Sequence, residues 1–229
     1  MDAGATRINV PDTVGCAMPG EYGAMIAEVV GRAGPGVIVS AHCHDDMGLA
    51  TANTVAAVQM GARQVEVTVN GIGERAGNTA VEEVAVVMAM KGVANTGIDL
   101  TQVNAISQMV SRITGVSVQP NRPIVGANAF AHSSGIHQDA ILKNPQNYEF
   151  VTPRSVGVEG HRFVMTARSG QSALVHMARE MGFEMTPPQC DAACETFARI
   201  ADESSGEVNK DAIWAIIEEV VQPVEVPSN

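Results

Sequence analysis

VIVSAHCH, residues 37–44, is a β-branched, apolar run that ends in two histidines. Two further β-rich runs flank it along the chain, TRINVPD at Thr6–Asp12 and QVEVTVN at Gln64–Asn70. Each run is followed by a segment with the apolar spacing of a helix, at residues 19–32, 47–60 and 79–91. Because strands and helices alternate without hairpin turns, the sequence predicts βα units and a parallel sheet.

The spacing of these runs favours a barrel. They begin at residues 6, 37 and 64, so successive units are 37 − 6 = 31 and 64 − 37 = 27 residues long. A (β/α)8 TIM barrel has about 31 residues per unit, although a doubly wound sheet would fit equally well. We therefore predict an α/β fold that contains the last three βα units of a partial TIM barrel. Roughly five units would then precede Met1, and we expect a truncated chain.

The second half of the chain has a different texture. A helix is predicted over residues 100–114, a mostly irregular stretch rich in Pro, Gly and Asn follows, and three more helices are predicted after residue 170. The predicted segments are the C-terminal part of a TIM-barrel catalytic domain (1–99), a helix plus an irregular linker subdomain (100–160), and a small helical subdomain with a tail (161–229).

Composition excludes several classes of protein. Of the 229 residues, 45% are hydrophobic, so the chain can bury a core and is not of the disordered class. Fourteen Lys and Arg against 25 Asp and Glu give a net charge of −11, which argues against nucleic-acid and anionic-membrane binding. The start has no secretory signal, and four cysteines are too few for a disulfide scaffold. We expect a cytoplasmic protein with reduced cysteines.

His42 and His44 form the first candidate site. They lie two residues apart at the end of a predicted strand, so their side chains leave the same face and could supply two ligands of a divalent metal ion. The alternative is a pair of solvent-facing or core histidines without a metal. Asp45 and Asp46 follow directly; they could support the imidazoles, and at least one of them is expected to cap the next helix.

The second candidate is NGIGERAGN at residues 70–78, again directly after a predicted strand. Its glycines permit a tight loop, Glu74 and Arg75 form a predicted ion pair, and the Asn78 amide could supply a third, oxygen ligand. The loop does not match a Walker or dinucleotide-binding pattern.

The third candidate is AFAHSSGIHQDAILK at residues 129–143. It contains His132 and His137, and Asp139 lies two residues after the second histidine. An imidazole beside a carboxylate could act as a general base. The alternative interpretation is that both histidines are ordinary residues of a surface loop.

Together these stretches resemble one family. PDTVG at 11–15, AHCHDDMGLA at 41–50, NGIGERAGN at 70–78 and HSSGIHQDAILK at 132–143 are similar to the 2-isopropylmalate synthase family. It belongs to the metal-dependent TIM-barrel acyltransferases and lyases, with homocitrate synthase, citramalate synthase and hydroxymethylglutaryl-CoA lyase. The resemblance extends from about Ala3 to Val220, and ERAGN favours isopropylmalate over homocitrate synthase.

The resemblance implies roles for individual residues. His42, His44 and Asn78 match family ligands of a divalent metal, Mg²⁺, Mn²⁺ or Zn²⁺, whereas the family's aspartate ligand has no counterpart here. Thr13 matches a residue that contacts the keto acid, and His137 matches the histidine proposed as catalytic base, which acts in a domain-swapped homodimer. We further expect Glu74 to be catalytic and Arg75 to bind substrate. The family's C-terminal leucine-sensing domain also has no counterpart.

The implied reaction joins acetyl-CoA to 3-methyl-2-oxobutanoate, and hydrolysis of the thioester by water then releases CoA and 2-isopropylmalate, which makes it the committed step of leucine biosynthesis. The alternatives are citramalate or homocitrate synthase, a metal-dependent hydrolase of another barrel family, and an inactive remnant that only folds or dimerises. We expect the isolated 229-residue chain to be inactive, because three strands leave both edges of a barrel sheet open.

Overall fold

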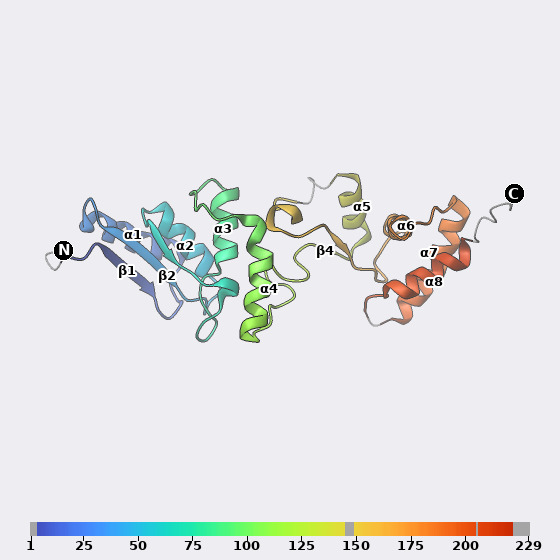
Figure 1. Cartoon of the computed structure of the whole chain (residues 1–229), viewed down its shortest axis with the longest axis horizontal. Helices are drawn as coiled ribbons and strands as arrows, with labels where there is room; N and C mark the ends of the chain where they lie inside the picture. Colours follow the sequence, from blue (N-terminus) through green and yellow to red (C-terminus); the bar gives the residue numbers. More distant parts are fainter. Residues whose placement is uncertain (1–3, 145–148, 205, 222–229) are drawn as a thin grey trace. The chain divides into compact units, whose positions relative to one another are not determined.

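The computed structural model describes residues 4–144, 149–204 and 206–221. The chain divides into two compact units (Figure 1). Unit 1 comprises Met1–Ala129 and Pro153–Glu159, and unit 2 comprises Phe130–Thr152 and Gly160–Asn229. The predicted division at residues 99 and 160 stays a prediction, and the predicted tail at residues 222–229 lies outside the described residues.

Unit 1 contains a parallel three-stranded sheet. The strands β1 (Arg7–Asp12), β2 (Ile38–Cys43) and β3 (Gln64–Glu66) lie in the order β1-β2-β3, with Arg7 opposite Ile38 and Ser40 opposite Gln64. The α/β class and the parallel sheet are therefore confirmed, while closure into a barrel stays a prediction.

Helices α1 (Pro19–Ala33), α2 (Ala50–Gln59) and α3 (Val81–Met90) follow the three strands. Figure 1 shows α1 and α2 side by side along the strands, and both contact β2. The core between them is mostly aliphatic and small, as the low aromatic content requires; it contains Tyr22, Ile26, Val39, Ala41, Cys43, Ala50 and Ala57.

The third strand is shorter than the predicted run of residues 64–70. It ends at Glu66, and the 3-10 helix η1 (Val69–Gly71) begins three residues later with Asn70 at φ 60°. The Asn70 side chain donates a hydrogen bond to the Ser107 carbonyl at 2.9 Å. Ser107 lies on α4 (Val103–Thr114), and α4 directly follows the 3-10 helix η2 (Leu100–Gln102). This hydrogen bond to a distant helix thus stabilises Asn70 in a conformation that does not continue the strand.

Unit 2 is mainly helical. A short parallel pair, β4 (Ala131–His132) and β5 (Arg162–Phe163), accompanies four helices, of which the last three have a common apolar core that includes Leu174, Phe197, Ile213 and Ile217. The helices are α5 (Gly135–Lys143), α6 (Gln171–Glu180), α7 (Pro187–Glu203) and α8 (Lys210–Val220).

Most of the described residues between 115 and 160 are irregular, as predicted, but α5 is a helix that the sequence did not predict. Gln138, Asp139 and Lys143 form side-chain hydrogen bonds, and of the nine residues of α5 only Gln138 and Ile141 are buried. The segment therefore lacks an apolar stripe. Its helix is held instead by Gln138, whose Nε2 donates to the carbonyls of His132 at 2.8 Å and Val164 at 3.3 Å. Among the described residues, no helix has the length and apolar character needed to span a membrane.

The four cysteines are free, as predicted. Cys16 is exposed, whereas Cys43 is buried and its burial raises the pKa of the thiol. Since only the thiolate reacts, we expect a disulfide reagent at neutral pH to modify Cys16 first and Cys43 only after unfolding. Titration in denaturant without reductant should find all four thiols, and finding only two would contradict this prediction.

Candidate metal centre

The two histidines of the first motif lie together at the carboxyl end of β2. His42 Nε2 and His44 Nε2 are 3.3 Å apart, and the two rings meet edge to face with centroids 5.1 Å apart. The expected common face is confirmed. Ligands of one small ion with bonds near 2.1 Å lie about 3.0–3.4 Å from one another, so this nitrogen pair has the spacing of a chelate.

Backbone hydrogen bonds bring Asn78 to the same place. Asn78 pairs with His44 in an antiparallel bridge, and Thr79 N donates to the Cys43 carbonyl at 3.1 Å. The Asn78 Nδ2 donates to the Ile72 carbonyl at 3.0 Å, which directs the amide oxygen the other way. That oxygen, Oδ1, is buried and accepts no hydrogen bond within the described part of the chain.

The residues fit a bound cation. A buried amide oxygen without a partner is costly, and a cation beside it removes that cost. The Nδ1 atom of His44 is also buried without a hydrogen-bond partner among the described residues, whereas His42 Nδ1 faces the carboxylate of Glu66. The described residues contain no group of three or more His, Cys, Asp or Glu side chains suited to a metal, so the candidate centre depends on the Asn78 amide.

Glu66 is a residue to which the sequence assigned no role. It lies opposite His42 in the parallel register of β2 and β3, and its Oε2 is 3.5 Å from His42 Nδ1. Ser40 Oγ and Asn9 Nδ2 donate to its two carboxylate oxygens at 3.0 and 3.2 Å. Glu66 is thus the carboxylate beside the imidazoles, and only the strand register could have identified it.

The two aspartates after His44 act differently from one another. Asp45 Oδ1 accepts from the Ala50 amide at 2.9 Å and so caps the first turn of α2, as predicted for at least one of the pair. Asp46 forms a bidentate ion pair with Arg75, with Nε to Oδ1 at 2.7 Å and Nη2 to Oδ2 at 3.0 Å.

The hydrogen bonds from Arg75 hold the pKa of the Asp46 carboxyl below its usual range. The contribution of the pair is therefore present above the ordinary Asp pKa and is lost only as pH falls through the lowered value. Asp46 and Arg75 stay paired in mildly acidic solution.

The predicted pair of Glu74 with Arg75 is the weaker of the two contacts. Arg75 Nη1 lies 3.7 Å from Glu74 Oε2, and the Glu74 side chain is 86% exposed. Arg75 also donates from Nη2 to the Thr13 carbonyl at 2.7 Å, and Thr13 itself is exposed in the turn after β1. Thr13, Asp46 and Arg75 therefore meet, although they come from three different strand ends.

Two buried polar side chains without a predicted role stabilise the end of β1. Asp12 accepts from the Cys16 and Ala17 amides at 3.2 Å each. Tyr22 donates to the Val10 carbonyl at 2.6 Å and accepts from the His42 amide at 3.3 Å. Its burial raises the pKa of the phenol well above the usual range, so Tyr22 stays protonated and ties β1 to β2 directly behind His42.

The third motif lies in unit 2, where His137 is on α5. Its neighbour His132 has Nε2 at 3.3 Å from Nδ1 of His161, and His161 in turn pairs with the buried carboxylate of Glu149. Burial, followed by the charges of His161 and His137, lowers the pKa of His132. Gln138 fixes α5 to β4 and to the residue that follows β5, so His137 lies on an anchored helix rather than in an open loop.

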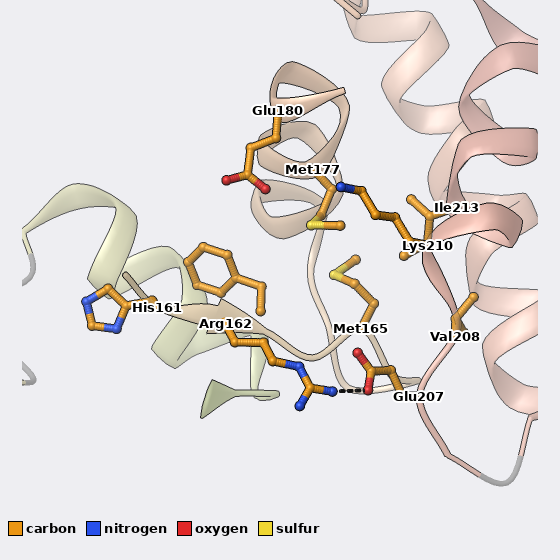
Figure 2. Close-up of a pocket in the computed structure, with 10 residues that line it drawn as sticks. His161, Arg162, Met165, Met177, Glu180, Glu207, Val208, Lys210 and Ile213 are labelled. Carbon is orange, nitrogen blue, oxygen red and sulfur yellow. Dashed lines mark hydrogen bonds and ion pairs between the residues drawn. The ribbon is translucent and has the colours of Figure 1, made fainter. Parts of the chain in front are cut away.

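Unit 2 also has a pocket of about 270 Å³ that the sequence did not predict (Figure 2). Its floor is apolar and includes Met165, Met177 and Ile213. The Arg162–Glu207 ion pair lies on one side, and Glu180 and Lys210 lie on the other. None of the predicted site residues lines this pocket.

The sequence of this chain matches models of known protein families. Residues 1–110 match the model of the family described as HMGL-like, and residues 124–205 match that described as homocitrate synthase post-HMGL domain-like. The first 110 residues are thus similar to the HMGL-like family.

The chain is similar to 2-isopropylmalate synthases over most of its length. It is 46% identical to that of Lysinibacillus sphaericus, covering 98% of this chain and 45% of the relative. It is 48% identical to that of Haemophilus influenzae, covering 89% of this chain and 40% of the relative. An HMG-CoA lyase structure from Acinetobacter baumannii is 25% identical with a TM-score of 0.47, over 51% of this chain and 40% of that one.

The resemblance inferred from the motifs is thus confirmed, and the chain spans less than half the length of these relatives. The HMGL-like region, residues 1–110, contains His42, His44, Asn78, Thr13, Glu74 and Arg75, and the second matched region contains His137. The predicted roles of these seven residues stay predictions.

Proposed function

We propose that this chain is part of a 2-isopropylmalate synthase that condenses acetyl-CoA with 3-methyl-2-oxobutanoate. The names of the relatives support this reaction, and one structural observation supports the site: Asn78, whose backbone pairs with that of His44, has a buried Oδ1 that accepts no hydrogen bond from the described residues. In this proposal His42, His44 and Asn78 hold a divalent cation, Mg²⁺, Mn²⁺ or Zn²⁺, because a mixed nitrogen and oxygen set accepts all three. Such a cation, when bound, supplies Lewis acidity to polarise the keto acid carbonyl.

The side chains around this centre have proposed roles of their own. The exposed Thr13 hydroxyl and the Nη1 of Arg75 would orient the carboxylate of the keto acid. His137 would accept the proton from the acetyl methyl group on a ring nitrogen, since an imidazole exchanges protons near neutral pH. Glu74, with its exposed carboxylate, would assist this proton transfer. We further propose a cytoplasmic, domain-swapped homodimer in which His137 serves the site of the partner.

The test uses the parent protein that contains these residues. Thiol release from acetyl-CoA should require 3-methyl-2-oxobutanoate, should stop on chelation, and should return when a divalent metal is added. The Glu28→Gln variant is a matched control, because its exposed pair with Arg32 on α1 is remote from the proposed reaction. Metal-independent turnover would contradict the proposed centre.

The keto acid itself separates this proposal from its nearest rival. The second matched region carries the name of homocitrate synthase, whose keto acid would be longer and dicarboxylic. We expect the parent to prefer 3-methyl-2-oxobutanoate over both pyruvate and 2-oxoglutarate.

The purified 229-residue chain should show no turnover with any of these keto acids, and metal-dependent CoA release from it would overturn that expectation.

A further inference from the structure

We propose that Asp46 and Arg75 are positioning residues that hold the loop of residues 70–78 so that the Asn78 amide faces the two imidazoles. This inference rests on the proposed metal centre and adds to it residues that contact neither the cation nor, through these atoms, the substrate. The basis of the inference is that the guanidinium of Arg75, which follows β3, forms hydrogen bonds to Asp46 after β2 and to Thr13 after β1.

The clamp, defined as Thr13, Asp46 and Arg75, spans the edge of the sheet. Arg75 follows β3, Asp46 follows β2 and Thr13 follows β1. Two parallel N–H···O bonds at 2.7 and 3.0 Å join Arg75 to Asp46, and a third at 2.7 Å reaches the Thr13 carbonyl. Bidentate pairs of this kind are geometrically specific, so a lysine at position 75 could not reproduce all three bonds.

The loop needs such a restraint because its backbone is unfavourable. Arg75 itself has φ 56°, in the left-handed region that a non-glycine residue seldom adopts. Without the guanidinium contacts, this residue would relax towards a more common conformation and the turn would change shape.

The turn is coupled to Asn78 through consecutive hydrogen bonds. Gly77 N donates to the Glu74 carbonyl at 2.8 Å, and the Gly77 carbonyl accepts from Asp45 N at 3.0 Å. Asn78 N donates to the Gly71 carbonyl at 3.0 Å. Arg75 therefore lies inside the turn that ends one residue before the proposed ligand, and a shift of the turn moves the Asn78 amide relative to His44.

The experiment measures Co²⁺ binding to the full chain, with the visible d–d absorption of the bound ion as the readout. Asp46→Asn keeps the shape of the side chain but removes its charge, and Arg75→Lys keeps the charge but loses the fork. We expect each variant to raise the Kd about 10- to 100-fold and to alter the absorption band, with little change in the melting temperature. Glu28→Gln, which breaks the exposed i,i+4 pair with Arg32, should leave the Kd unchanged.

The double variant Asp46→Arg with Arg75→Asp should recover part of the affinity lost by the single variants, because the pair can reform in reverse. Wild-type Kd values for Asp46→Asn and Arg75→Lys would overturn the clamp while leaving the metal centre intact. Unfolding of both single variants would also overturn it, since the pair would then support the whole unit. If the wild-type chain binds no Co²⁺ in a manner that depends on His44, the proposed centre fails and the clamp fails with it.

Discussion

Replacing His44 with alanine is expected to weaken divalent metal binding by about 100-fold or more. The substitution removes one of two nitrogens that lie 3.3 Å apart and leaves a chelate with one imidazole. Loss of groups that only support a ligand already costs about 10- to 100-fold in affinity, and loss of a ligand should cost at least as much. Isothermal titration with Zn²⁺ and Mn²⁺ would measure the change, and His42→Ala should behave alike.

His176→Ala is the matched control for this prediction. His176 lies on α6 in unit 2, where its Nε2 is 3.5 Å from Glu180 Oε1 at the helix surface. Its replacement removes an imidazole without touching the candidate centre, so we expect the metal affinity to stay at the wild-type value. Equal losses in His44→Ala and His176→Ala would indicate nonspecific binding to histidines and would refute the centre.

The second large effect is expected from Gly77→Ala. Gly77 has φ 88°, and a Cβ built at this position would overlap the carbonyl oxygen of Gly71. That oxygen also accepts the hydrogen bond from Asn78 N at 3.0 Å, so the new methyl group acts directly on the segment that places the proposed ligand. We expect a loss of about 2–3 kcal/mol in unfolding free energy and a metal Kd raised at least about tenfold.

Gly182→Ala separates the two causes of this loss. Gly182 has φ 87°, but a Cβ there would meet nothing within 4 Å. Alanine at position 182 therefore has the same strain from the left-handed backbone but no steric overlap. We expect it to lower the unfolding free energy by about 1 kcal/mol. Denaturant unfolding of the two variants would measure the difference. Equal losses would show that backbone strain alone explains the effect at Gly77, contrary to the prediction.

Local pattern was sufficient for most of the secondary structure. The β-rich runs before His44 and around Val65 and the apolar spacing of residues 19–32 depend on neighbours in the chain, and the structure has strands and helices there. The same reasoning placed His42 and His44 on one face, because a strand alternates its side chains with period two. It failed at α5, where no apolar stripe marks the helix and the buried Gln138 anchors it through the carbonyls of His132 on β4 and of Val164 directly after β5.

The sequence by itself therefore determined the order of the three βα units, the parallel sheet and the choice of candidate ligands, but not β4, α5 and β5. Only the tertiary structure decided that Arg75 pairs with Asp46, 29 residues away, in preference to its neighbour Glu74. It also decided that Glu66 lies beside His42 and that the Asn78 Oδ1 accepts no hydrogen bond from the residues that the structure describes. The physical reason is that periodicity fixes the direction of a side chain from its own strand or helix. Partners on other strand ends depend on register and on loop backbone angles, which no short pattern encodes.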